Sequence, residues 1–240
     1  MLTTTTLQRE ARYGIPAADQ ILTNRDYTIG YSYYFRQAKW ALEIIDPGTI
    51  DIARKDNFRS DYRIPSIFRA DKADYVNSGY DRGHLVSSAN HNEADLQNSE
   101  TFLLSNMSPQ SPDLNRRKWA ELEEAVRKLD RQSSIYETYV LSGPVFFFDQ
   151  PVQSIGSKDK NGVTIPIPNA YFKCVLTENN RGYLHMWAFL LENKLNDKPL
   201  ADYRVSTDKI EQYTGIKIWE KLVGRKMELE RGRVRKMWKY

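Results

Sequence analysis

The sequence predicts an α+β fold: a single domain in which helices flank a central, mostly antiparallel β-sheet. Several segments place Tyr, Ile, Trp and Phe in near alternation, which is typical of strands. One segment carries apolar residues at spacings of three to five, which suit an amphipathic helix. No linker separates two apolar cores, so we expect one domain over residues 1–240, with its core at about 25–217 and a basic extension over 218–240.

The expected strands lie in both halves of the chain. The first strand-like segment covers residues 27–45 and ends before a turn at Pro47-Gly48. Residues 51–80 are irregular and polar. Four later segments are rich in aromatic and β-branched residues, and they cover residues 135–148, 163–168, 170–178 and 183–191.

Two helices are expected from start and stop signals. Pro112 is tolerated in the first turn of a helix that continues through the amphipathic segment 114–130. Asp208 followed by Glu211 resembles a helix cap, and Gly215 would end that short helix. The last twenty residues also favour a helix.

The composition excludes several classes of protein. Hydrophobic residues make up 40% and charged residues 28%, which excludes global disorder. The single cysteine, Cys174, excludes an intramolecular disulfide and a multi-cysteine zinc site. No apolar run approaches the ~20 residues that a bilayer span needs, so we expect no membrane contact of that kind.

The net charge of +4 is a property of the C-terminus. The last twenty residues hold eight Lys and Arg against two Glu, so the other 220 residues carry a net charge of −2. The basic tail is either an additional non-specific DNA anchor or a solvated helix.

The motif Asp81-Arg82-Gly83-His84 carries groups suited to phosphate chemistry. A histidine is the usual general base near neutral pH. Arg82 can pair with a phosphate, and Asp81 can fix a neighbouring group or an outer-shell water. A surface loop with a stray histidine is the simpler interpretation of the motif alone.

A helical stripe strengthens the functional interpretation. Asn115, Trp119, Glu123 and Arg127 are spaced by four and would share one face. An amide oxygen suits Mg²⁺, a carboxylate can hold its waters and a guanidinium can hold a phosphate. The alternative is an ordinary ion pair between Glu123 and Arg127 on a solvated helix face.

Basic clusters lie on both sides of the motif. Such groups neutralise phosphates without reading bases, although most charge clusters are only solvated faces. The clusters are Arg54, Lys55, Arg59 and Arg63 upstream, and Arg116, Arg117 and Lys118 beside Asn115.

Four blocks in a fixed order carry a family resemblance. They are ARKDNFRSD (53–61), SGYDRGHLVSSANH (78–91), TFLLSNMSPQSPDLNRRKWAELE (101–123) and YVLSGPVFF (139–147). The chain resembles, over roughly residues 30–190, the DNA/RNA non-specific endonucleases of the ββα-metal class. DRGH alone is a weak signal, whereas the ordered set is highly specific.

The resemblance implies a metal-dependent, sugar-non-specific nuclease that leaves 5′-phosphate products. His84 would be the general base, and Asn115 the one direct protein ligand of a hydrated Mg²⁺, with Mn²⁺ as an alternative. Glu123 and Asp81 would contact the metal through water. The arginines implied in charge stabilisation and phosphate binding are Arg54, Arg82, Arg127, Arg59 and Arg116. Asn106 would shape the site rather than perform chemistry.

The expected partners are the backbones of DNA and RNA. A nucleic-acid-binding module without catalysis is the rival, but pure binding needs neither His84 nor Asn115. A homodimer and an inhibitor protein stay open as further partners. The localisation is open: secreted or periplasmic if an export signal is missing from this sequence, mitochondrial as the alternative.

Five other features receive structural interpretations. His91 is interpreted as a loop residue, His185 as a packed histidine in an apolar strand and Cys174 as a small buried hydrophobe. Trp119 is expected to pack its helix onto the sheet, and the Tyr-rich segment 27–34 to belong to the core.

Overall fold

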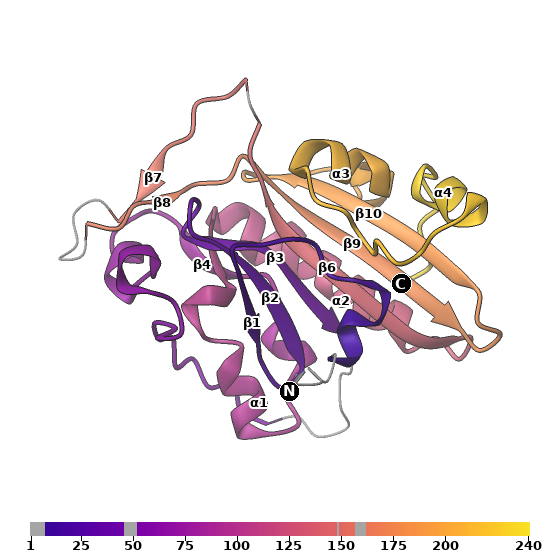
Figure 1. The fold of residues 1–240 in the computed structure, drawn as a ribbon, viewed down its shortest axis with the longest axis horizontal. Helices are drawn as coiled ribbons and strands as arrows, with labels where there is room; N and C mark the ends of the chain where they lie inside the picture. The colour runs from indigo at the N-terminus through magenta and orange to yellow at the C-terminus, as the bar shows by residue number, and fades with distance from the viewer. Residues whose placement is uncertain (1–7, 46–51, 148, 157–161) are drawn as a thin grey trace, which may run out of the picture.

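A seven-stranded antiparallel sheet forms the centre of the protein in a computed structural model, which describes residues 8–45, 52–147, 149–156 and 162–240 (Figure 1). Its strand order is β1-β2-β3-β6-β9-β10-β11. The strands are β1 (Gln20–Thr23), β2 (Tyr27–Ser32), β3 (Gln37–Ile44), β6 (Ile135–Val145), β9 (Ala170–Asn179), β10 (Leu184–Glu192) and β11 (Arg204–Val205). The sheet and its flanking helices confirm the predicted α+β class.

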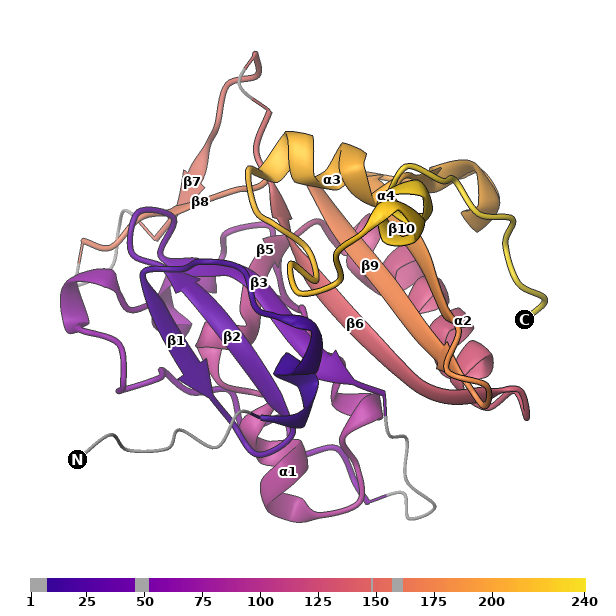
Figure 2. The same cartoon turned by 45° about the vertical axis from the view of Figure 1, so that its right-hand side comes forward.

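The helices cover both faces of this sheet (Figure 2). Helix α2 (Ala120–Asp130), preceded by the π-helical segment η6 (Leu114–Trp119), packs on one face. Helices α3 (Thr207–Thr214) and α4 (Arg225–Arg231) pack on the other. The remaining helices are α1 (Asp95–Glu100) and the 3₁₀ turns η1 (Arg9–Tyr13), η2 (Ser66–Phe68), η3 (Lys72–Tyr75), η4 (Ser88–Asn90), η5 (Leu104–Asn106) and η7 (Leu200–Tyr203).

Two small two-stranded sheets lie outside the main sheet. Strand β4 (Asp81–His84) pairs with β5 (Met107–Gln110), and β7 (Ser154–Ile155) pairs with β8 (Ile165–Pro166). Because η6 and α2 follow β5 in the chain, β4, β5 and this helix make a ββα unit. The expected ββα arrangement is therefore present.

Several predicted boundaries were wrong. Residues 27–45 form two strands, because the chain turns between Ser32 and Gln37 with Arg36 at a φ of 53°. Strand β1 was not predicted, since only one of its four residues is buried and no alternation is visible. The strand expected at 163–168 shrinks to Ile165–Pro166. The turn predicted at Pro47-Gly48 lies outside the described residues.

Helix α3 confirms its predicted end and corrects its predicted start. Gly215 ends the helix in the left-handed conformation, with a φ of 67°. The N-cap is Ser206 rather than Asp208, since the Ser206 hydroxyl accepts a hydrogen bond from the Lys209 amide at 3.3 Å.

The C-terminal tail packs in part onto the body instead of forming one long solvated helix, and the alternative of a DNA anchor stays a prediction. Only Arg225–Arg231 are helical within the last twenty residues. The following chain runs beside β10 and α2, where Trp187 Nε1 donates to the Lys236 carbonyl at 3.0 Å. Trp238 Nε1 donates to the Ala125 carbonyl at 2.8 Å, and Met237 and Trp238 pack against the core.

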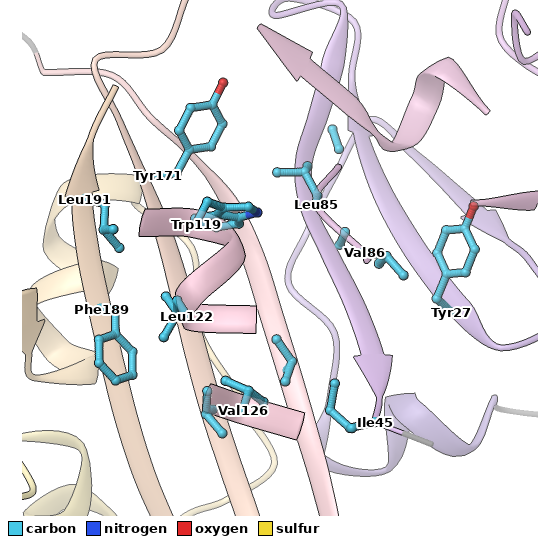
Figure 3. Close-up of a cluster of buried hydrophobic side chains, with 14 of the residues drawn as sticks. Tyr27, Ile45, Leu85, Val86, Trp119, Leu122, Val126, Tyr171, Phe189 and Leu191 are labelled. Carbon is cyan, nitrogen blue, oxygen red and sulfur yellow. The ribbon is translucent and has the colours of Figure 1, made fainter. Parts of the chain in front are cut away.

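The core between α2 and the sheet is aromatic and aliphatic. Figure 3 shows Trp119 and Leu122 between Leu191 and Phe189 of β10 on one side and Leu85 and Val86 of the segment after β4 on the other. The rings of Trp119 and Tyr171 meet edge to face at 5.8 Å, which confirms that Trp119 packs its helix onto the sheet.

Other core expectations are confirmed with one exception. Cys174 is buried, and so are Tyr27 and Tyr31, but Tyr34 is 79% exposed because it lies in the turn between β2 and β3. Within the described ranges, the structure contains no helix that is long and apolar enough to cross a membrane.

Candidate active site

The Asp81–His84 segment is a strand rather than a surface loop. It pairs antiparallel with β5, placing Asp81 opposite Gln110 and His84 opposite Met107. Gly83 is required by packing, since a Cβ atom there would lie 2.3 Å from the Gln110 side chain. Close packing of Gly83 against Gln110 therefore holds the motif in place beside strand β5.

Four hydrogen bonds join β4 and the residues after it, up to position 90, to the helix stripe. We call these four bonds the seam. The bonded residues follow at intervals of three along β4 and the segment after it, and at intervals of four along the helix. The bonds run from Asn115 Nδ2 to Asp81 Oδ2 (2.9 Å), from Trp119 Nε1 to the His84 carbonyl (3.1 Å), from Ser87 Oγ to Glu123 Oε2 (2.9 Å) and from Arg127 Nη1 to Asn90 Oδ1 (3.1 Å). The stripe predicted from spacing is thus one face lying along the DRGH segment.

The seam fixes the orientation of Asn115. Its NH₂ group donates to Asp81, so Oδ1 is the atom left for a ligand. Asp81 also accepts two hydrogen bonds from Arg116, at 2.8 and 2.7 Å. Burial alone would raise the pKa of Asp81, but the bonds from Arg116 and Asn115 outweigh it and lower this pKa. Asp81 therefore stays ionised and keeps the Asn115 amide in place.

Asn115 lies in an unusual part of its helix. The segment Leu114–Trp119 is π-helical, and the Ser111 carbonyl accepts from the Asn115 amide at 2.9 Å. The Ser111 hydroxyl accepts from the Leu114 amide at 3.2 Å, which satisfies a free donor at the helix start. Short π-helical insertions occur frequently at functional sites.

His84 is enclosed by two aromatic rings. Phe58 and Phe102 meet the imidazole edge to face, with ring centroids 5.8 and 5.0 Å away. Each ring carries an arginine: Arg82 lies 4.3 Å from the Phe58 centroid, and Arg54 lies 4.8 Å from that of Phe102. The Nε2 atom is buried and has no hydrogen-bond partner in the described part of the chain.

This environment keeps His84 neutral. Burial is the main cause that lowers the pKa of His84 to about 3, and the charge of Arg54 adds to it while Asp56 opposes it. At neutral pH the imidazole is therefore unprotonated, and its free nitrogen can accept a proton.

Glu123 is half-buried, and its Oε1 atom is shielded from solvent. Its Oε2 accepts from Ser87, and Oε1 has no hydrogen-bond partner among the described residues. Burial raises the pKa of Glu123, against the opposing effects of Lys173, Ser87 and Arg127. The alternative of a solvated Glu123–Arg127 pair was wrong, because Arg127 forms its ion pair with Glu124, at 2.9 Å.

The predicted basic residues do not all reach the same place. Arg54 and Arg82 lie at His84, and Arg127 lies at the far end of the seam. Arg59 donates to the Ser99 carbonyl at 2.8 Å and lines a separate cavity of about 450 Å³ with Arg25 and Arg63. Lys55 pairs with Asp95, and Arg63 pairs with Asp61. Arg116 is exposed and bound to Asp81.

Three other singled-out residues have structural surroundings. His91 lies in the loop after η4, as predicted, and is buried there with Nε2 3.0 Å from Glu43 Oε2. Asn106 is buried, and its amide binds both the N–H and the C=O of Val86, which fits the expected shaping role. His185 is half-buried and contacts the ring of Trp187, as expected of a packed histidine.

Sequence reasoning missed two buried charges near the seam. Glu43 on β3 and Lys173 on β9 are 0% and 2% exposed. Each interrupts an apolar run within its strand, and that interruption was the available signal. Their proximity to Glu123 depends on the sheet register and could not be predicted.

The donor set fits a hydrated hard cation. Among the described ranges, no group of three His, Cys, Asp or Glu residues could hold a metal. The free Asn115 oxygen and the unpartnered Glu123 oxygen are instead hard ligands, which suit an ion that keeps most of its waters.

Comparisons with known proteins agree with this geometry. Residues 9–224 match the family described as DNA/RNA non-specific endonuclease. The chain is 33% identical over 219 residues to human mitochondrial endonuclease G, covering 86% of this chain and 71% of that protein. It is 34% identical over 224 residues to a nuclease of Syncephalastrum racemosum, covering 86% and 69%.

A solved structure matches the fold. It is described as the crystal structure of the EndoG/EndoGI complex and the mechanism of EndoG inhibition, with a TM-score of 0.83 and 28% identity over 93% of this chain and 95% of that one. Relatives from human and yeast are named as mitochondrial, which supports the mitochondrial alternative. The chain belongs to the DNA/RNA non-specific endonuclease family and is a metal-dependent endonuclease that acts on nucleic acids.

Proposed function

We propose that the protein hydrolyses phosphodiester bonds of DNA and RNA with one hydrated Mg²⁺, which Mn²⁺ can replace, and leaves 5′-phosphate products. The seam carries this proposal. It brings the segment with His84 alongside the helix that bears Asn115, Glu123 and Arg127.

His84 is the proposed general base. Its neutral Nε2 takes a proton from the attacking water, and no internal hydrogen bond to another described residue has to be broken first. Phe58 and Phe102 hold the ring in one orientation and exclude water from its sides.

Asn115 and Glu123 are the proposed metal-holding groups. Asn115 Oδ1 would bind the ion directly, while Glu123 Oε1 and the Asp81 carboxylate would order its waters. When bound, the ion supplies positive charge at the phosphoryl oxygens and an acidic water for the leaving 3′ oxygen.

Some of the arginines are proposed to bind the scissile phosphate, and the others the phosphates that flank it. Arg54 and Arg82, stacked on the rings around His84, and Arg127 stabilise charge on the scissile phosphate. Arg59 and Arg116 point elsewhere and would contact flanking phosphates. Contacts made mainly to the backbone explain activity on both sugars.

The wider setting is proposed from the same family. Residues 1–240 would act as one nuclease domain, with about 25–217 as its core and 218–240 as an extension packed on it. We propose a mitochondrial location, as the names of several relatives suggest. An inhibitor protein is a proposed partner because the matched structure is an inhibitor complex, and a homodimer is the second assembly to test.

Digestion of two substrates tests the proposal. Supercoiled plasmid and bulk RNA are each incubated with the protein in Mg²⁺ or in EDTA, and the product ends are labelled. Degradation of both substrates in Mg²⁺ alone, with 5′-phosphate ends, is the expected result. Persistence of both substrates in Mg²⁺ contradicts it.

A further inference from the structure

Three polar residues lie on the sheet face beneath the catalytic helix. They are Glu43 on β3, Ser142 on β6 and Lys173 on β9, and none is more than 2% exposed. Ser142 pairs with Lys173 on one side and with Ala41 on the other, so the three share the face that α2 covers. The residues next to them on that face, Ala41, Val140, Tyr171 and Val175, are apolar, and two buried threonines, Thr138 and Thr177, lie further along it.

Lys173 touches the seam from below. Its ammonium lies 4.4 Å from the ring centroid of Trp119, the residue that donates to the His84 carbonyl. Its Nζ also donates to the Ser142 hydroxyl at 2.8 Å. Neither contact neutralises a buried positive charge, so the charge balance must come from carboxylates.

Two nearby carboxylates, the buried Glu43 and the half-buried Glu123, provide that balance without a direct ion pair to Lys173. Glu123 is the strongest favourable charge acting on Lys173, and Glu43 is the next. In both carboxylates Oε1 has no hydrogen-bond partner among the described residues. Glu43 Oε2 accepts from Asn90 and approaches His91, whereas Glu123 Oε2 accepts only from Ser87. Glu43 and Glu123 repel each other, and Lys173 offsets this repulsion.

A buried lysine at this position lowers the stability of the folded protein. Burying an ion costs several kcal/mol, and replacement of buried ionic groups by apolar ones of similar volume is often neutral or stabilising. Methionine would continue the apolar face and fill a comparable space. Stability of the fold alone therefore does not explain the charge.

We propose that Lys173 is a positioning residue of the nuclease site: its buried ammonium, which lies beneath Trp119, attracts the Glu123 carboxylate one turn further along the stripe without forming a direct ion pair, and so keeps the free oxygen of Glu123 toward the metal-bound water. The inference rests on the proposed function of Glu123. Lys173 acts through Glu123 and, being buried, does not touch the substrate.

The test is a double-mutant cycle read by metal affinity. Binding of Mn²⁺ without substrate is measured by electron paramagnetic resonance for wild type, K173M, E123Q and K173M/E123Q. We expect K173M to weaken Mn²⁺ binding by about tenfold, as outer-shell changes typically do. In the E123Q background the same substitution should change affinity less than about twofold.

Kinetics and two further variants separate positioning from stability. K173M should lower kcat and leave the KM for plasmid DNA unchanged. V175A removes buried volume from the same face and should lower the melting temperature without changing Mn²⁺ affinity. S142A removes only a hydrogen bond of Lys173 and should weaken Mn²⁺ binding slightly, which keeps the test available if K173M fails to fold.

Two outcomes overturn the inference: equal losses from K173M in both backgrounds, or wild-type Mn²⁺ affinity in both K173M and S142A. A failure of the proposed function is recognised separately, because E123Q would then leave both Mn²⁺ binding and cleavage unchanged.

Discussion

At the scale of single residues, Asn115 was predictable as a ligand candidate, but the direction of its amide was not. The four-residue spacing indicates which side of the helix it occupies. Its orientation depends on Asp81, which lies 34 positions away and meets it only in the folded ββα unit. Spacing along one element cannot specify a hydrogen bond made to another.

Exchange of the two partners tests this orientation. In N115D, two carboxylates would face each other where a 2.9 Å hydrogen bond now holds the pair. Like charges repel at that distance, so plasmid nicking in Mg²⁺ should fall by at least about tenfold. D81N/N115D restores a donor and an acceptor and should recover part of the loss.

The control for this exchange is D113N, which removes an exposed charge two residues before Asn115 and should nick at the wild-type rate. A fully active N115D, or a double variant no better than N115D, would show that Asp81 does not orient the ligand.

The pH dependence of cleavage follows from the enclosed imidazole. The neutral form of His84 is the proposed base, and its pKa is lowered to about 3 from an ordinary value of 6.5. As pH falls from 8 to 5, His84 should therefore stay unprotonated, and kcat/KM should show no acid limb near 6.5. R54Q removes one cause of the lowering and should shift any His84 limb to higher pH.

The measurement is kcat/KM on plasmid between pH 4 and 8 at saturating Mg²⁺. R12Q is the matched control, because Arg12 pairs with Glu178 and lies on η1. A wild-type limb near 6.5 would contradict the enclosure of His84.

At the scale of elements, the amphipathic segment predicted its helix, and the stripe predicted the helix face that meets β4 and the residues after it. The π-helical stretch was invisible, because it is a backbone register that side-chain spacing does not encode. Strand β4 was also missed, since four polar residues give no alternation and are held by β5. Short elements stabilised by a distant partner are the ones that sequence patterns fail to show.

Gly83→Ala tests how closely strands β4 and β5 pack against each other. The new Cβ would lie 2.3 Å from the Gln110 side chain, so β4 and β5 must separate or Gln110 must move. We expect a loss of about 1–3 kcal/mol in the free energy of unfolding in urea, together with slower cleavage. Gly232→Ala, where φ is −72° and the nearest atom is 3.3 Å away, should change stability much less. Equal stability of both variants would contradict the tight fit.

At the scale of the whole molecule, the sheet class was predictable because its long strands are strongly patterned. The path of the tail was not, because a charged sequence with two aromatic anchors resembles a solvated helix until its partners are known. Met237 and Trp238 bind surfaces built by β10 and α2, far earlier in the chain. The tail therefore ties the catalytic helix to the edge of the sheet.

Trp238→Ala measures how much the packing of the tail contributes to the stability of the fold. The substitution removes packing against the core and the 2.8 Å hydrogen bond to Ala125. It should lower the free energy of unfolding by about 2–4 kcal/mol, somewhat less than full burial would give. Tyr240→Ala, which removes an aromatic ring that is 49% exposed, is the control and should have a small effect. Equal effects of the two changes would place the tail in solvent.

The central claim is that His84 performs the chemistry while other groups bind the substrate. The most direct measurement compares plasmid nicking in Mg²⁺ with DNA affinity for His84→Ala, with His185→Ala as the histidine control. Nicking should be abolished in His84→Ala while the Kd for DNA stays within about twofold, because the base is not a phosphate anchor. His185→Ala should nick at the wild-type rate. Undiminished nicking by His84→Ala, or a collapse of its DNA binding, would contradict the account.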